Sequence, residues 1–274
     1  MKNKIPDFAY HMTKFFTEYL PIQRNLSPNS IATYRDTFRL LLLFYDTEKH
    51  IKPNLLTLDM LDVQGIEDFM LWLKKERNCG ASTCNQRLGA LKSFFRYLQF
   101  ALPDRALQCQ ENLAIRPMKQ SEPGLKYLTI DGIKLLLEQP DIKTKYGRRD
   151  LAILSLMYDT GARVQEIADI KIVHIRFSAP ATIRITGKGD KTRVVPLLSR
   201  TEDILKQYIK DFKIDAGGND AYLFQNRNGQ HLSRFGISYI LTKYADKARK
   251  VHPELIPERL SPHCIRHSKA MHLL

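Results

Sequence analysis

Large apolar side chains recur at helical spacing through the first hundred or so residues, and this period limits the possible folds more than any other feature. Four helices are expected, over residues 8–20, 28–45, 63–76 and 83–98. Ser27 followed by Pro28 is typical of a helix start, because serine caps free amides and proline suits the first helical position. Ser82 is the expected cap of the fourth helix. Four such helices within about one hundred residues indicate a small helical bundle.

The pattern changes between residues 101 and 125. Pro103, Pro117 and Pro123 interrupt this stretch, and its periodicity is weak. Such composition is typical of a linker. We therefore expect a helical domain over residues 1–105, a linker over 106–125 and a second domain over 126–274.

Residues 126–274 mix helical and strand-like patterns. Runs at 172–177, 182–186 and 192–198 predict short strands, and the last two flank a glycine-containing turn. Helices are expected over residues 132–138, 149–159, 200–212, 232–250 and 262–274. The predicted fold is therefore mainly α, with a helical N-terminal domain and an α+β second domain that contains a small antiparallel sheet.

The formal charge of +14 favours a polyanionic partner such as nucleic acid, because lysine and arginine gain affinity by releasing counterions from phosphates. A solvated basic surface that keeps the protein soluble is the alternative. The same choice applies to the basic residues of the predicted bundle, which are Arg35, Arg39, Arg87, Lys92 and Arg96.

The composition also bears on location. The sequence holds no apolar run of about 18 residues, so a membrane span is not expected. Its four cysteines form no CxxC pair. These features favour a soluble cytoplasmic protein with free thiols.

Three short segments carry candidate chemistry, and the first is Thr160–Ile167. Gly161 is placed to end a helix, and Arg163 then begins the next one. Glu166 follows one turn later and can hold the guanidinium group in place. A simple surface salt bridge is the alternative interpretation.

The second segment is the predicted hairpin turn around Lys188, which Gly187 and Gly189 flank. A lysine at a hairpin tip points away from the core and suits a proton donor or a phosphate contact. Lys191 and Arg193 follow it as candidate DNA contacts. A basic turn without function is the alternative, and the segment does not fit the phosphate-loop pattern of nucleotide-binding proteins.

The third segment begins at Ser261-Pro262, which is typical of a helix start. His263 and Arg266 lie three residues apart, so they share one face of that helix and can hold one phosphate. A metal site built on His263 and His267 is less favoured, because the glutamate of the HExxH motif is missing.

Taken in order, the three segments resemble the motifs of the tyrosine recombinases, the phage integrase family, which includes Xer-type and transposon-borne integrases. Arg163 stands in a TGxRxxE segment and Lys188 in a GKGxKxRxVPL segment. His263 and Arg266 begin a segment that reads HxxRHxxAxHLL. The stretch from Ser27 to Leu42 is also similar to the family's N-terminal domain, so the resemblance covers nearly the whole chain.

This resemblance implies a four-helix SAM-like core-binding domain followed by an α+β catalytic domain. It implies that a complete enzyme from a mobile element or phage breaks and rejoins double-stranded DNA at specific recombination sites. The reaction would pass through a 3′-phosphotyrosyl intermediate, in a tetramer on DNA, with neither metal nor ATP as cofactor.

The resemblance also implies a role for each site residue. Arg163 and Arg266 would clamp the scissile phosphate. Lys188 would protonate the 5′-oxygen leaving group, and His263 would hydrogen-bond the phosphate. Glu166 would orient the site residues without contacting the phosphate itself.

One departure from the family pattern concerns the nucleophile. The family continues past this helix to a segment that supplies the nucleophilic tyrosine, and none of the twelve tyrosines of this sequence stands in that context. We therefore expect the 274-residue chain, as a truncated form, to lack the covalent step. A catalytically inactive DNA-binding fragment is the alternative function, and a metal-dependent nuclease would need carboxylate clusters that the sequence does not show.

Overall fold

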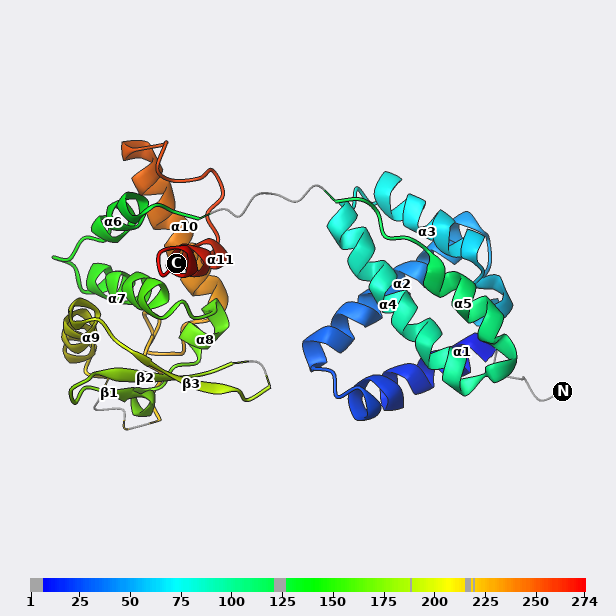
Figure 1. Ribbon diagram of the computed structural model, residues 1–274, viewed down its shortest axis with the longest axis horizontal. Helices are drawn as coiled ribbons and strands as arrows, with labels where there is room; N and C mark the ends of the chain where they lie inside the picture. The colour runs from blue at the N-terminus through cyan, green and yellow to red at the C-terminus, as the bar shows by residue number, and fades with distance from the viewer. Residues whose placement is uncertain (1–6, 121–126, 188, 215–217, 219) are drawn as a thin grey trace. The chain divides into compact units, whose positions relative to one another are not determined.

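The computed structural model describes residues 7–120, 127–187, 189–214, 218 and 220–274. The chain divides into two compact units, Met1–Glu122 and Pro123–Leu274 (Figure 1). Each unit has its own hydrophobic core. The predicted class, mainly helical with one small antiparallel sheet, is confirmed. No helix in the described ranges is long and apolar enough to cross a bilayer.

The first unit is entirely helical in its described part. Its α-helices are α1 (Asp7–Lys14), α2 (Pro28–Glu48), α3 (Val63–Lys75), α4 (Ala81–Ala101) and α5 (Ala106–Ala114). A π-helical segment, Phe15–Gln23, continues α1, and single 3-10 turns occupy Pro53–Leu55, Leu58–Met60 and Pro103–Arg105.

Aromatic side chains fill the centre of this unit. The ring of Phe94 from α4 meets those of Phe15 and Phe38 edge-on, and both centroid distances are 5.2 Å. Edge-to-face pairs of this kind add to the free energy of simple burial. They hold α2 and α4 against the segment that follows α1.

Of the two N-caps predicted for this unit, the structure confirms one and contradicts the other. Ser27 caps α2, with its Oγ accepting from Ser30 N at 3.4 Å and with Pro28 at the first position, as expected. The cap predicted at Ser82 is wrong, because α4 begins at Ala81 and Gly80 is its N-cap. Gly80 has the extended backbone that an N-cap needs, and glycine is itself an acceptable cap.

The structure differs from the expected linker over residues 106–114, which form α5. Cys109 and Asn112 of α5 and Ile115 directly after it are buried at a spacing of three residues, and Cys109 and Ile115 belong to the hydrophobic core of the first unit. Because one of the three is polar, the apolar period of α5 is too weak to be recognised in the sequence.

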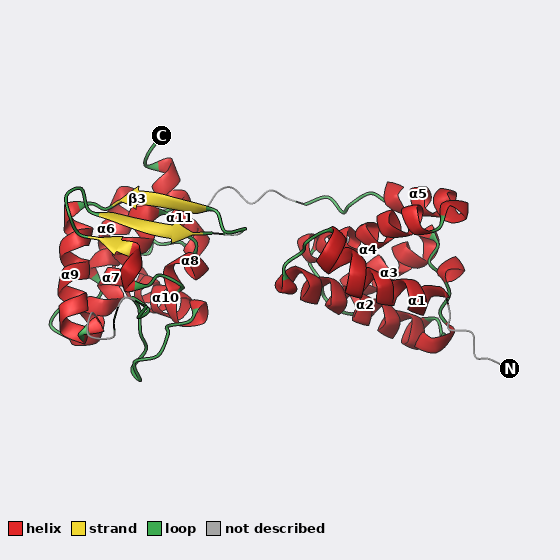
Figure 2. Ribbon diagram, turned by 90° about the horizontal axis from the view of Figure 1, so that it is seen from below, coloured by secondary structure: helices red, strands yellow, loops and turns green. Residues whose placement is uncertain are grey.

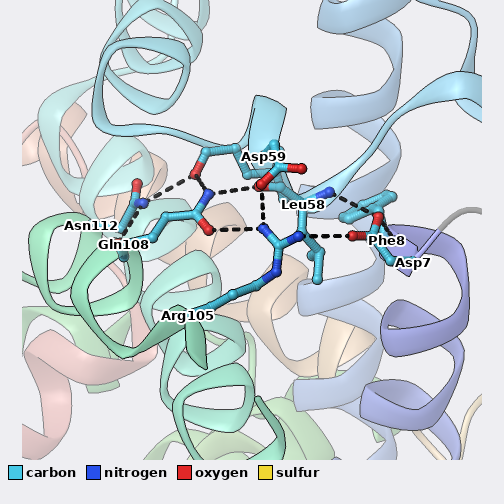
Figure 3. A network of polar contacts seen from close by, with 8 residues as sticks. Asp7, Phe8, Leu58, Asp59, Arg105, Gln108 and Asn112 are labelled. Carbon is cyan, nitrogen blue, oxygen red and sulfur yellow. Dashed lines mark hydrogen bonds and ion pairs between the residues drawn. The ribbon is translucent and has the colours of Figure 1, made fainter. Parts of the chain in front are cut away.

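A polar network attaches this missed segment to the rest of the unit (Figure 3). Arg105 pairs with Asp59 at 2.5 Å and with Asp7 at 3.4 Å. Gln108 Nε2 donates to the carbonyl of Leu58 at 2.7 Å, and Asn112 Nδ2 donates to that of Leu61 at 3.0 Å. The network therefore joins α5 to the start of α1 and to the 3-10 turn before α3.

The chain beyond α5 is also fixed to the first unit. The side-chain amide of Asn85 on α4 makes two 2.8 Å hydrogen bonds to the backbone of Met118, one as donor and one as acceptor. Lys92 Nζ donates to the carbonyl of Ile115 at 2.6 Å. Residues 115–118 thus follow the surface of α4.

We predict that Asn112→Ala lowers the free energy of unfolding by about 1–3 kcal/mol, because it removes a buried side chain and leaves the carbonyl of Leu61 with only the longer contact from Gln108 Nε2, at 3.4 Å. Asn112 is 1% exposed. The matched control is Leu107→Ala on the same helix, where the side chain is 70% exposed and the expected change is within about 0.5 kcal/mol. Urea unfolding of both variants tests this, and equal stabilities would show that α5 does not belong to the first core.

The second unit contains the sheet and the remaining helices. Its helices are α6 (Ile130–Glu138), α7 (Lys145–Thr160), α8 (Val164–Ala168), a 3-10 turn (Ile172–His174), α9 (Ser199–Phe212), α10 (Arg234–Val251) and α11 (Pro262–Met271). Its strands are β1 (Ile175–Arg176), β2 (Thr182–Thr186) and β3 (Thr192–Pro196). The strands lie on one side of these helices (Figures 1 and 2).

The sheet is antiparallel in the order β1-β2-β3. Ile183 and Ile185 of β2 point into the core, as the alternation of that strand predicts. Ile183 lies opposite Val195 of β3 and Ile175 of β1. The run at 172–177, predicted as one strand, begins instead as a 3-10 turn, because the His174 ring accepts from Lys171 N at 3.1 Å and closes the backbone.

Candidate functional site

The turn between α7 and α8 positions Arg163. Gly161 ends α7 in the left-handed conformation, with φ of 56°, and its N–H donates to the Met157 carbonyl at 3.1 Å. Arg163 then caps α8, and its own backbone N–H donates to Glu166 Oε2 at 2.9 Å. Gly161 therefore ends α7 as the sequence predicted, and Glu166 accepts a backbone hydrogen bond at the start of α8.

The carboxylate of Glu166 also holds two guanidinium groups. Its Oε1 accepts from Arg163 Nη1 at 2.9 Å, and its Oε2 accepts from Arg193 Nη2 at 2.7 Å. Burial alone would raise the pKa of this carboxyl group, but the hydrogen bonds from Arg193 and Arg163 outweigh burial and lower the pKa from 4.5 to about 2. The side chain is therefore an anion at neutral pH.

We call Arg163, Glu166 and Arg193 the arginine–glutamate cluster. It carries two positive charges and one negative charge, so one positive charge remains. The side chain of Arg163 is 52% exposed, whereas that of Glu166 is 5% exposed. A guanidinium group fixed from behind by a buried carboxylate and open in front is suited to bind an anion such as phosphate.

The hairpin between β2 and β3 reaches the same cluster through Gly187. A Cβ atom added to Gly187 would lie 2.8 Å from Glu166 Oε1 and 3.7 Å from Arg163 Nη1. Only a glycine leaves room for this approach. The predicted site residue Lys188 is the next residue, and it lies outside the described residues.

Helix α11 packs beside the α7–α8 turn. A Cβ atom added to Gly161 would lie 3.7 Å from Lys269 Cγ, and Lys269 Nζ lies 3.8 Å from Asp159 Oδ1. Ser268 Oγ, fully buried, accepts from Leu128 N at 2.8 Å. These contacts fix α11 beside the segment that carries Arg163.

The two predicted site residues of α11 differ in their surroundings. His263 is exposed in the first turn of the helix. Arg266 lies one turn before Lys269 on the same side of the helix, and its Nη1 is buried without a hydrogen-bond partner among the described residues. A buried donor without an acceptor costs about 1–3 kcal/mol, so this nitrogen is suited to receive an anion.

The structure thus brings Arg163, Glu166, Gly187 and Arg193 into contact and places α11 next to them. Within the described ranges, no hydrogen bond or ion pair joins Arg266 or His263 to the arginine–glutamate cluster. Convergence of Arg266 and Arg163 on one phosphate therefore stays a prediction.

The basic residues predicted for the first unit are not equivalent. Three of them, Arg35, Arg39 and Arg96, are exposed. The Nε of Arg39 lies 3.9 Å from Asp36 Oδ1. Arg87 is partly buried, and its Nη1 has no partner among the described residues. Burial lowers the pKa of Lys92, and its ammonium group holds the Ile115 carbonyl, a role that the sequence did not indicate.

Two contacts near α11 were also not predicted from the sequence. Tyr158 OH and His272 Nδ1 lie 2.9 Å apart, and the ammonium group of Lys269 lies 5.3 Å from the centroid of the Tyr158 ring. They join the end of α11 to α7. Only the pairing of residues 114 positions apart, which no local pattern reveals, could have indicated them.

We predict that Glu166 makes stability depend on pH in the acid range. Because its folded pKa is about 2 and its ordinary value is 4.5, its contribution is complete above pH 4.5 and disappears as the pH falls toward 2. The wild-type chain should lose about 3 kcal/mol more than Glu166→Gln between these limits.

The control for this measurement is Glu258→Gln at an exposed position of the same unit. Denaturant unfolding across the acid range tests the prediction. Parallel pH profiles for wild type and Glu166→Gln would mean that the carboxylate is not held as the geometry indicates.

Comparisons with known proteins identify the family of the chain. The family model described as "Phage integrase family" matches residues 126–274, and the one described as "Phage integrase, N-terminal SAM-like domain" matches residues 14–100. A putative integrase/recombinase of Sinorhizobium fredii is 35% identical over 263 residues, which cover 96% of this chain and 78% of that protein. Tyrosine recombinase XerD of Listeria monocytogenes is 32% identical over 266 residues, with 94% and 83% covered.

Solved structures show the same fold. The integrase of transposon Tn1549, in complex with a circular intermediate DNA, superposes with a TM-score of 0.74. The match covers 98% of this chain and 87% of that one at 15% sequence identity. The expected pair, a SAM-like helical domain and an integrase catalytic domain, is thereby confirmed.

Proposed function

This chain belongs to the phage integrase family of site-specific tyrosine recombinases, and from that premise we propose that it binds double-stranded DNA and supplies the phosphate-binding residues for strand cleavage and rejoining. The observation that carries the proposal is the pair of arginines in the second unit. Arg163 is half-exposed and fixed by a buried carboxylate, and Arg266 has a buried nitrogen that finds no acceptor among the residues that the structure describes.

The proposed roles follow from charge and position. Arg163 and Arg266 bind the nonbridging oxygens of the scissile phosphate and stabilise the negative charge that grows in the transition state. Glu166 keeps Arg163 in one orientation. His263 at the start of α11 hydrogen-bonds the same phosphate, and Lys188 protonates the 5′-oxygen that leaves.

Several observations support DNA as the partner. The chain has a net charge of +14 and two units, each with exposed basic side chains. The Tn1549 integrase, which shares the fold, was solved with DNA. We propose that both units contact one duplex and that the assembled form on paired recombination sites is a tetramer.

We assign no nucleophile between residues 1 and 274. The hydroxyl of Tyr158, which lies near α11, is engaged with His272. Burial raises the pKa of Tyr208 and of Tyr244 above the ordinary value of a tyrosine, and the two hydroxyls donate to the Leu223 carbonyl and to Asp150 Oδ2 in the core. Binding of recombination sites without cleavage is accordingly the second candidate function for the 274-residue polypeptide.

We predict that the affinity for duplex DNA falls steeply with salt. With about five to eight phosphates contacted, the slope of log affinity against log salt should be about −4.5 to −7 between about 50 and 200 mM. Arg266→Gln should make the slope less steep by about one, whereas Lys134→Gln on the exposed face of α6 should not change it. A salt-independent affinity would contradict DNA as the partner. A wild-type slope for Arg266→Gln would show that this arginine does not contact a phosphate.

We also predict that residues 1–274 form no covalent adduct with a nicked duplex, because cleavage needs a hydroxyl aligned with the phosphate, and misplacement by about 1 Å costs about 10²-fold. A denaturing gel with labelled DNA measures the adduct. Fusion of the C-terminal segment of a tyrosine recombinase should give an adduct, and Arg163→Ala in that fusion should slow its formation by about 10²–10³-fold. A protease-sensitive adduct from residues 1–274 alone would identify a nucleophile within them.

A further inference from the structure

Arg193 has surroundings that differ from those of Lys191, another basic residue on its hairpin. Its Nη2 donates to the buried Glu166 Oε2 at 2.7 Å, and its side chain is 37% exposed. Lys191, two residues earlier, is exposed, and the structure shows no ion pair for it within the described ranges. The same positive charge therefore stands in two different settings on one hairpin.

We propose that Arg193 is a positioning residue that fixes the β2–β3 hairpin and Arg163 through Glu166, and that it does not bind a DNA phosphate. This inference deepens the proposed function and rests on it for its consequence, which is a preformed phosphate site. The attachment of the hairpin by Arg193 is argued from the geometry alone and does not depend on DNA binding.

The two carboxylate oxygens of Glu166 divide their partners. Oε1 accepts from the side chain of Arg163, and Oε2 accepts from Arg193 and from the backbone N–H of Arg163. Loss of Arg193 leaves Oε2 with a single donor and leaves the carboxylate free to turn. Because the same carboxylate orients Arg163, a change at Arg193 reaches Arg163 without direct contact.

Arg193 of β3 and Gly187, the residue after β2, both lie against this carboxylate. Arg193 lies opposite Ile185 in the register of β2 and β3, and Thr192 lies opposite Thr186. Gly187 follows directly, and its backbone closes against Glu166 Oε1. The end of the hairpin is thus attached to α8 at two points, one by an ion pair and one by close packing.

Charge gives the reason for an arginine at this position. Arg163 and Arg193 would repel each other if Glu166 did not lie between them. The hydrogen bond from Arg193 is the largest of the effects that lower the pKa of Glu166. An arginine that neutralises a buried carboxylate in this way keeps the carboxylate ionised, and its charge is already matched within the protein.

Salt dependence separates a positioning role from a phosphate contact. Each arginine or lysine that neutralises a phosphate adds about one to the slope of log affinity against log salt. The test variant is the double substitution Arg193→Gln with Glu166→Gln, because it removes one charge of each sign and keeps the net charge of the cluster. The matched control is Lys191→Gln on the same hairpin.

Hydrogen exchange of the full chain without DNA gives the second measurement. The amide of Gly187 donates to the Lys191 carbonyl at 2.9 Å and reports whether the end of the hairpin is closed. We expect the double variant to keep the wild-type salt slope, and we expect Arg193→Gln alone, in which Glu166 is kept, to exchange this amide at least about tenfold faster. Lys191→Gln should make the slope less steep by about one and leave the exchange rate unchanged.

A slope that becomes less steep by about one in the double variant, or a wild-type exchange rate at Gly187 in Arg193→Gln, would overturn the proposal. If the double variant does not fold, Arg193→Lys replaces it. Lysine keeps the charge but lacks the planar fork, so the slope should stay and the exchange should still rise several-fold. An unchanged exchange rate in Arg193→Lys would also overturn the proposal.

The two measurements keep this inference separate from the proposed function. If the wild-type chain shows no salt-dependent binding of a duplex, the proposed function fails, and hydrogen exchange still decides whether Arg193 holds the hairpin.

Discussion

The carboxylate of Glu166 lies between the guanidinium groups of Arg163 and Arg193, at 2.9 and 2.7 Å, and it is almost completely buried. A buried anion is stable only when its charge and its lone pairs are matched, so the protein must supply donors from several directions. They come from the start of α8 and from β3, and Gly187 of the hairpin covers the remaining side. One carboxylate thereby fixes how the helix, the sheet and the hairpin meet.

The same requirement explains why one positive charge stays available. Two guanidinium groups meet one carboxylate, and the outer arginine, Arg163, is open to solvent. Helix α11 is fixed beside the turn through Lys269 and Ser268, and it carries Arg266, whose buried Nη1 has no partner within the described part of the chain. The fold holds one arginine in a fixed orientation, and the described residues supply no acceptor for a buried donor of the other; binding of a phosphate would complete this arrangement.

Local sequence signals predicted the elements whose cause is local. Ser27-Pro28 begins α2, the alternation of Ile183 and Ile185 defines β2, and both lie where the pattern placed them. The segment α5 escaped prediction, because its stability comes from Asn112 and its neighbours bonding to a distant turn. The charge of Lys92 and of Arg193 predicted DNA contacts, and it gave no sign of the partners that they have within the protein, a backbone carbonyl and a distant carboxylate. A sequence pattern gives a residue's charge and its place in an element, and it does not give the partner that tertiary packing brings.

The central claim is that Arg163 and Arg266 hold one phosphate of a DNA strand between them. A crystal structure of the 274-residue chain with a duplex that carries its recombination site measures this directly. The account predicts that donor nitrogens of both arginines lie within about 3 Å of oxygens on the same phosphate, with Glu166 still bound to Arg163. Arginines that contact different phosphates, or that point to opposite faces of the second unit, would contradict it.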